Sequence, residues 1–296
     1  MVQSKVLKPT VETLRMHNRT VTELRKTSST GITYTNELNW HKCIVVAVGD
    51  AAHANAEVYL SDWDAVEPYR SQAGKLIFLA NEDALTSEDL IVACIAYSST
   101  IIKRVVRSTI QAEAYNIQNV VEEADMVRAA HVDCRGLLDR KAWERSSADQ
   151  MQMLWISDCN SLVTALSKAI VRTADKRLGL ELASLRQQLW RYQGRTALDA
   201  RIQEGAPPLS TRSDVLKWVD THVMAADCLT KIMKDTFLQR ILNTGRWCIS
   251  QPEIGRAQKE QKQQYRAAKR AAKTAGNDHD VPHGSETDGQ GDNPEE

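Results

Sequence analysis

An unbroken apolar run at residues 43–48 constrains the fold of this chain more than any other feature, because it stops abruptly at Gly49 and Asp50. A strand buried on both faces carries such a run, whereas a strand with one face in water alternates apolar and polar residues. A second, mainly apolar run ends in the same way at Asp158. Both runs predict central strands of a covered sheet, each ending on a carboxylate.

Strand and helix patterns alternate along the chain, which favours a layered α/β domain over a helical bundle or a β-sandwich. The predicted strands of the main sheet are residues 43–50, 75–80, 90–96, 151–158 and 215–219, with a further short strand at 32–35. The predicted helices are residues 9–28, a helix capped by Ser108 and Gln111, 162–170, 178–193, and 223–233 with an extension to 242, while 131–150 is a connecting helix or loop. The fold class is therefore α/β, with a mixed five-stranded sheet flanked by helices and three successive strands forming an antiparallel meander.

Composition narrows the classes of function. The 296 residues include 38 Lys and Arg and 38 Asp and Glu, so the chain does not coat nucleic acid through a dense positive field. Its first residues do not have the pattern of a secretory signal. It contains no apolar stretch near the roughly 18 to 20 residues of a membrane helix, and no Cys-x-x-Cys pair among six cysteines. We expect an intracellular protein of the cytoplasm, the nucleus or both, with free thiols and no membrane partner.

Four carboxylates fall where metal-dependent chemistry would need them. Asp50 and Asp158 end buried strands, and groups at strand ends line the crevice where α/β proteins bind ligands. Glu113 lies at the inward edge of its helix, and Asp227 lies near the start of the last core helix. Singly, each acid is explained as a turn cap or a surface charge. Jointly, they would repel one another unless hard divalent cations neutralised them, and two Mg2+ ions about 3.5 to 4 Å apart, with Mn2+ as a substitute, would suit phosphodiester hydrolysis.

Five sequence blocks around these acids form a recognisable succession. They are 48–53 (Val-Gly-Asp-Ala-Ala-His), 70–78 (Arg-Ser-Gln-Ala-Gly-Lys-Leu-Ile-Phe), 97–99 (Tyr-Ser-Ser) with 107–115 (Arg-Ser-Thr-Ile-Gln-Ala-Glu-Ala-Tyr), 158–162 (Asp-Cys-Asn-Ser-Leu), and 219–231 (Val-Asp-Thr-His-Val-Met-Ala-Ala-Asp-Cys-Leu-Thr-Lys). In this order, the blocks resemble the ribonuclease H domain that closes the Pol polyprotein of Ty1/copia-type retrotransposons, downstream of the reverse transcriptase. That family carries Ser-Asp-Ala-Asp-Trp in the first block and Ala-Asp-x-Leu-Thr-Lys in the last.

The resemblance implies a ribonuclease H-like fold and a metal site formed by Asp50, Glu113, Asp158 and Asp227 as the catalytic acids. It implies a hydrolase that cuts the RNA strand of RNA–DNA hybrids endonucleolytically during reverse transcription, with two Mg2+ ions. The reverse transcriptase region of the same polyprotein would be a partner. The chain contains no Tyr-x-Asp-Asp motif, so no polymerase activity is expected from it.

The resemblance also divides the chain. Residues 1–40 would be a remnant of the reverse transcriptase C-terminal or connection region, and residues 41–250 the ribonuclease H-like domain. Residues 251–296 cannot bury enough apolar surface to fold, so a disordered tail is expected, basic at first and then acidic.

Four further residues are candidates for contacts with the substrate. Asn160 stands at the position of a family Gln and could donate a hydrogen bond in the minor groove of the hybrid, where the 2′-hydroxyl is recognised. Lys103, Arg104 and Arg107 precede a predicted helix and are candidate phosphate contacts, although a solvated run of charges is the simpler explanation.

Two other interpretations remain open at this point. In the first block, the family's second acid and its Trp are replaced by Ala52 and His53. These departures are compatible with a catalytically decayed ribonuclease H-like module that binds nucleic acid or serves as a scaffold. An unrelated α/β protein that binds a small ligand is the third possibility. The sequence contains neither a Gly-x-Gly-x-x-Gly loop nor a Walker loop that would support it. The oligomeric state is left open.

Overall fold

The computed structural model describes residues 10–28, 31–59, 66–168, 173–189, 214–231, 233 and 235–250; for 56–59 and 66–68 it describes the backbone only. Its strands are β1 (Cys43–Tyr59), β2 (Val66–Asn81), β3 (Asp89–Ile101), β4 (Met153–Ser157), β5 (Val215–Trp218) and β6 (Arg246–Cys248). Its helices are α1 (Val11–Lys26), α2 (Thr109–Cys134), α3 (Trp143–Gln150), α4 (Asn160–Ser167), α5 (Lys176–Leu189), α7 (Asp227–Thr230) and α8 (Thr236–Thr244), with the 3-10 turns η2 (Glu82–Leu85), η3 (Arg140–Ala142) and η4 (Thr221–Val223).

The strands form one mixed sheet in the order β5-β4-β1-β2-β3-β6. Strands β1, β2 and β3 are the predicted antiparallel meander, while β4 runs parallel to β1 and β5 runs parallel to β4. The predicted α/β fold class is confirmed, and all five predicted strands of the main sheet are present. The sixth strand, β6, is an addition that pairs antiparallel with β3.

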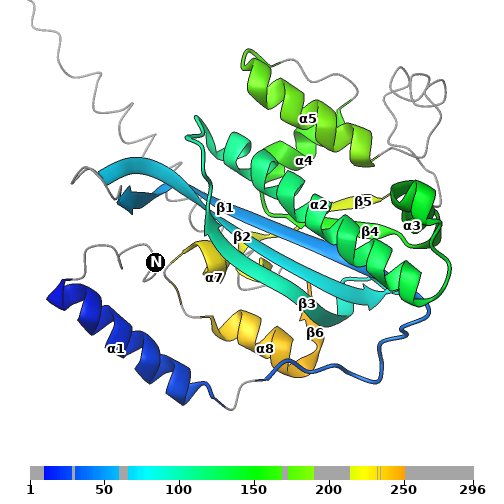
Figure 1. Cartoon of the computed structure of the whole chain (residues 1–296), viewed down its shortest axis with the longest axis horizontal. Coiled ribbons are helices and arrows are strands. Elements are labelled where there is room, and N and C mark those ends of the chain that lie inside the picture. Colours follow the sequence, from blue (N-terminus) through cyan, green and yellow to red (C-terminus); the bar gives the residue numbers. More distant parts are fainter. Residues whose placement is uncertain are drawn as a thin grey trace, which may run out of the picture. The chain divides into compact units, whose positions relative to one another are not determined.

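Helices cover both faces of the sheet, as Figure 1 shows: α2, α4 and α5 lie on one face, and α7 and α8 lie on the other. Strand β1 serves both layers. Its residues Val45 and Ala47 pack into the core under α2, and Ile44, Val46 and Val48 pack into the core under α8. All five side chains are buried, which accounts physically for the continuous apolar run.

Helix α2 begins where the sequence predicts. The hydroxyl of Ser108 accepts a hydrogen bond from the backbone N–H of Gln111 at 3.3 Å, and the Gln111 side chain accepts one from the N–H of Arg107 at 2.8 Å. In the standard capping box, the second bond would go to the N–H of the cap residue itself. The start of the helix is fixed at both sides, which sets the position of Glu113 one turn later.

Three parts of the predicted secondary structure are wrong. The first strand does not end at Asp50, because β1 continues to Tyr59 through its pairing with β2. Residues 32–35 form no strand; instead, the N–H of Thr33 donates to the carbonyl of Leu242 at 2.8 Å. The predicted helix over 223–242 is divided into η4, α7 and α8. Residues 223–226 are all buried, and four consecutive buried residues cannot lie on one face of a helix. The chain therefore inserts this segment into the core in an irregular conformation.

Two predicted features lie outside the described residues: the end of the helix predicted over 178–193 and the tail at 251–296. The domain boundary at residue 40 stays a prediction. Within the described residues, all six cysteines are free thiols. No helix among them combines the length and the hydropathy that crossing a bilayer requires.

Candidate metal centre

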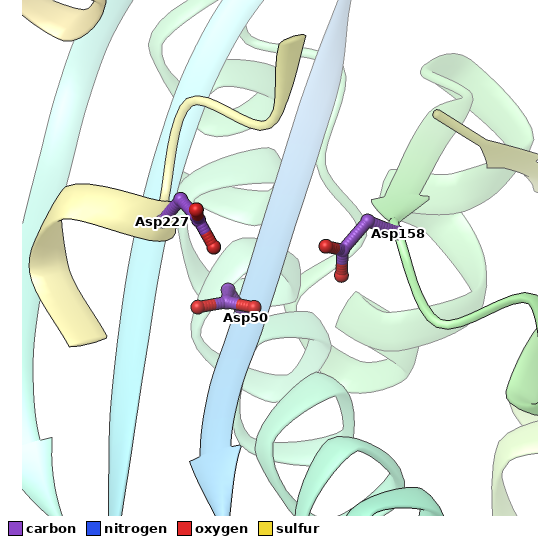
Figure 2. A group of neighbouring side chains, drawn as sticks. All are labelled: Asp50, Asp158 and Asp227. Atoms are coloured by element: carbon purple, nitrogen blue, oxygen red, sulfur yellow. The ribbon is translucent and has the colours of Figure 1, made fainter. Parts of the chain in front are cut away.

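Three aspartates from distant parts of the sequence converge at one end of the sheet. Asp50 lies on β1, Asp158 follows the last residue of β4, and Asp227 is the first residue of α7. Each offers a carboxylate oxygen, and these oxygens all lie within 4.8 Å of one another. Figure 2 shows the three side chains pointing toward a common space beside β1. We call Asp50, Asp158 and Asp227 the acid cluster.

Asp50 is held through both its backbone and its side chain. The side-chain amide of the buried Asn116, from α2, donates to the carbonyl of Asp50 at 2.7 Å and to the carbonyl of Gly74 at 3.0 Å. Asp50 and Gly74 are paired across β1 and β2, so Asn116 ties the two strands together at this position. The Asp50 carboxylate accepts a hydrogen bond from the hydroxyl of Thr230, at the end of α7.

Helix α7 carries Asp227 and rests directly on Gly74. A Cβ atom at this glycine would lie 2.9 Å from Leu229 Cβ and from Thr230 Cγ2, and 3.1 Å from the carbonyl oxygen of Ala226. Any side chain larger than hydrogen would push α7 away from the sheet. The close approach at Gly74 therefore sets the depth of α7 and the position of Asp227 relative to Asp50.

Asp158 is held from the side of β5. The hydroxyl of Thr221 donates to its carboxylate at 2.9 Å, and the indole N–H of Trp218 donates to its carbonyl at 2.9 Å. Residue 221 begins η4, the turn that leads from β5 toward α7. The loop after β5 thus orients Asp158 and then leads directly to Asp227 at the start of α7.

Glu113 lies beside the acid cluster without belonging to it. Its side chain is 4% exposed, and it accepts a hydrogen bond from the N–H of Ala51 at 3.2 Å. Burial raises the pKa of Glu113 well above its usual range, and the charges of Asp50 and Asp158 act in the same direction. Of the four predicted acids, the structure therefore brings three together within 4.8 Å, and the fourth, Glu113, is hydrogen-bonded to the residue that follows Asp50 on β1.

The acids of the cluster are costly to ionise together. Burial raises the pKa of Asp50 from 3.8 to about 6, despite the opposing effects of the Thr230 hydrogen bond and the charge of Lys231. Burial also raises the pKa of Asp158, to which the charge of Asp227 contributes. The raised pKa values of Asp50 and Asp158 show that their negative charges are poorly neutralised, and a divalent cation would stabilise both.

Lys231 supplies the positive charge at this site. Its ammonium group donates to the carboxylate of Asp227, and its side chain is 43% exposed. The possible metal ligands around it are carboxylate oxygens, which Mg2+ and Mn2+ prefer. Three aspartates and Glu113 face this single ammonium among the described residues, so the cluster fits a divalent cation in both chemistry and charge.

Sequence reasoning did not assign roles to Lys231, Thr230 or Asn116. The first two stand in the last sequence block, and Lys231 follows Asp227 at a spacing of four residues, which brings side chains together along one helical turn. This spacing was a usable signal. Asn116 gave no such signal, because its two carbonyl partners become neighbours only when β1 and β2 pair.

The predicted substrate contacts lie in different environments. Asn160 is exposed at the start of α4, two residues after Asp158, and Lys103 and Arg107 are exposed ahead of α2. Arg104 is engaged within the chain: it forms an ion pair with Glu181 at 2.5 Å and lies over the ring of Tyr115 at 4.1 Å. The substrate roles of all four stay predictions.

Comparisons with known proteins add one structural similarity. No protein-family model matches the sequence, and no curated protein matches it. Among solved structures, the chain is similar to LC11-RNase H1, isolated from compost by a metagenomic approach, with a TM-score of 0.34 and 14% sequence identity. The similarity covers 67% of this chain and 99% of that chain. The function is therefore inferred from the acid cluster and the sequence motifs.

Proposed function

We propose that this chain is a ribonuclease H-type endonuclease that hydrolyses the RNA strand of RNA–DNA hybrids. One observation carries the proposal: three of the four acids that the sequence blocks single out, Asp50, Asp158 and Asp227, meet within 4.8 Å of one another. They arrive from β1, from the end of β4 and from α7, and the fourth acid, Glu113, lies against the same segment of β1.

Asp50, Asp158 and Asp227 would hold the divalent cations, and Glu113, hydrogen-bonded to β1 next to Asp50, would be the fourth catalytic acid. Two Mg2+ ions, or Mn2+ in their place, would supply Lewis-acid stabilisation of the charge that develops on the phosphodiester. The chain's own contribution is to fix the ligands in advance. Thr230 orients the carboxylate of Asp50, and Thr221 orients that of Asp158. Ligands positioned in this way lose little freedom when the substrate arrives.

The hybrid would be bound by groups near this end of the sheet. Asn160 is exposed near Asp158 and would donate to the minor groove of the hybrid. Lys103 and Arg107 would contact phosphates, and Arg104 would do so only by leaving Glu181. The four residues belong to the proposal because of their exposure and their place in the sequence blocks.

The order of the five sequence blocks supports a retroelement origin of the Ty1/copia type. In this proposal the enzyme acts during reverse transcription, and the reverse transcriptase region of the same polyprotein is its partner. Residues 1–40 would then be the remnant of the region that precedes the nuclease.

A catalytically decayed module is the second candidate. Ala52 and His53 replace the acid and the Trp of the family's first block, and an ammonium group already binds one acid of the cluster. Such a module would bind the hybrid without cutting it.

The test is cleavage of a labelled RNA–DNA hybrid in Mg2+ and then in Mn2+, with the unmodified chain, Asp50→Asn and Asp89→Asn. Asp89 is an exposed acid at the start of β3, so its variant makes the same chemical change away from the cluster. We expect cutting of the RNA strand alone, dependent on the metal, lost in Asp50→Asn and retained in Asp89→Asn. Binding without cutting by a folded chain would support the decayed module instead.

A further inference from the structure

Lys231 binds one of the three carboxylates that a metal ion at this site would also use. Its ammonium group donates to Asp227, and Asp227 offers an oxygen to the space shared with Asp50 and Asp158. The charge of Lys231 also reaches beyond this one bond: it opposes the increase in the pKa of Asp50, Glu113 and Asp158. One lysine therefore acts on every carboxylate of the site.

The lysine remains charged in these surroundings. Burial alone would lower the pKa of Lys231, but the hydrogen bond to Asp227 and the charges of Asp50, Asp227 and Asp158 outweigh that effect and raise it. A positive charge near three carboxylates repels a divalent cation that uses the same oxygens. Lys231 and a divalent cation would therefore compete for Asp227.

The local backbone leaves the lysine free to move away. Helix α7 ends at Thr230, and the backbone of Lys231 is extended, with φ of −124° and ψ of 151°. The side chain is 43% exposed, whereas that of its partner Asp227 is 11% exposed. The ammonium can therefore turn into solvent by rotation about its own side-chain bonds, without disturbing the packing of α7 on the sheet.

We propose that Lys231 is a resident counter-ion that partly neutralises the acid cluster in the absence of metal and is displaced from Asp227 when a divalent cation binds. It thereby weakens the affinity of the site for the cation and stabilises the metal-free fold. This inference rests on the proposed function, because it assumes that the acid cluster is a metal site.

The experiment measures the affinity of the full chain for Mn2+ alone by isothermal titration calorimetry. The variants are Lys231→Met and Lys231→Gln, which remove the charge, Lys231→Arg, which keeps it, and Lys26→Met. Lys26 forms an exposed ion pair with Glu23 on α1, so its variant removes a comparable lysine elsewhere. We expect Lys231→Met and Lys231→Gln to bind Mn2+ on the order of tenfold more tightly. Lys231→Arg and Lys26→Met should stay close to the unmodified chain.

A second readout separates competition from a purely structural role. With chelator present, Lys231→Met should melt at a lower temperature than the unmodified chain, and saturating Mn2+ should raise its melting temperature by more. Equal or weaker Mn2+ binding by both uncharged variants, with binding retained by the unmodified chain, would overturn the inference and leave the proposed function standing. Absence of Mn2+ binding from every protein would overturn both. Binding by the uncharged variants alone would support the inference in its strongest form.

Discussion

The two ends of the parallel strands β4 and β5 each carry a group of acids, and the two groups are neutralised very differently. At the amino end, Arg128 lies between Asp125 and Asp214 and forms an ion pair with each. Asp214 also accepts a hydrogen bond from the N–H of Met153 at 2.9 Å, at the start of β4. At the carboxyl end, the acid cluster has Lys231 as its cation. We call Asp125, Arg128 and Asp214 the buried arginine cluster.

Arg128 and Lys231 differ in their burial and in the number of carboxylates that each binds. The side chain of Arg128 is fully buried and donates to two carboxylates and to the carbonyl of Met151, so it has no route to solvent. Lys231 is 43% exposed and binds one carboxylate of several. Buried acids by themselves therefore do not mark a functional site. An excess of acids over fixed cations, next to an exposed and replaceable cation, distinguishes the candidate site from the structural one.

The largest expected effect comes from opening the buried arginine cluster. Arg128→Met would leave Asp125 and Asp214 buried without their common partner, and we expect the free energy of unfolding to fall by about 3–5 kcal/mol. Arg140→Met is the matched control, because Arg140 is 80% exposed and pairs with Asp133 at the surface. It should leave the free energy of unfolding nearly unchanged, because solvent screens an exposed surface ion pair. Urea denaturation followed by circular dichroism measures both, and equal losses would contradict the comparison.

The next effect is a pH dependence of the free energy of unfolding, caused by the acid cluster. The pKa of Asp50 is raised from 3.8 to about 6 in the folded state, so the folded state holds the proton more tightly than the unfolded state between these values. The free energy of unfolding should therefore fall as pH rises through this window, by about 3 kcal/mol at most. Denaturation with chelator present at pH 4 to 7 tests this, and Asp50→Asn should flatten the curve. A slope unchanged in Asp50→Asn, as expected for Asp89→Asn, would argue against Asp50 as its source.

A smaller effect should follow from disturbing the packing beneath the acid cluster. The added methyl of Gly74→Ala would push α7 from β2, and overpacking of this kind costs about 1–3 kcal/mol. The same displacement should weaken Mn2+ binding, because it moves Asp227 away from Asp50. Gly31→Ala is the control, since nothing lies within 4 Å of a Cβ there. Calorimetry and denaturation should separate the two variants; unaltered Mn2+ affinity in Gly74→Ala would show that the site tolerates this displacement.

The smallest effect extends the comparison to surface cations. Arg104 forms an ion pair with Glu181 and lies over the ring of Tyr115, whereas Arg107 is exposed. Arg107→Gln should reduce the slope of log Kd against log salt for hybrid binding by about 1, as the loss of one phosphate contact does. Arg104→Gln should leave that slope nearly unchanged. Fluorescence anisotropy with a labelled hybrid gives both slopes, and a larger change for Arg104→Gln would reverse the assignment.

The sheet and the convergence of three acids could be predicted because each rests on a local pattern. The apolar run of β1 is continuous since both of its faces are buried, and Asp50 and Asp158 stand at or directly after strand residues that the pattern marks. Asp50 is not the end of its strand as predicted, because β1 continues to Tyr59; it lies two residues beyond Val48, the last β1 residue paired with β4, and the parallel pairing therefore brings it beside Asp158. The position of Asp227 was also approximately right, because it does begin a helix.

The features that the sequence did not predict depend on contacts between distant segments. The apolar residues 223–226 resemble the start of a core helix in sequence, and only the burial of all four reveals the break. Strand β6 is three residues long and is anchored by Trp247, which is 1% exposed and packs against Phe78 at 5.8 Å between ring centroids. Neither feature has a local signal of its own. The support that Asn116 gives to Asp50 is likewise visible only after β1 and β2 have paired.

The hydrogen bond between Thr230 and Asp50 spans 180 positions of the chain. During synthesis on the ribosome, β1 emerges long before α7. Asp50 therefore lacks its hydrogen bond to Thr230 until α7 has been synthesised. A chain arrested before residue 227 can pair β1, β2, β3 and β4 but cannot assemble the acid cluster. Any activity of this site therefore requires a nascent chain that extends at least through Thr230.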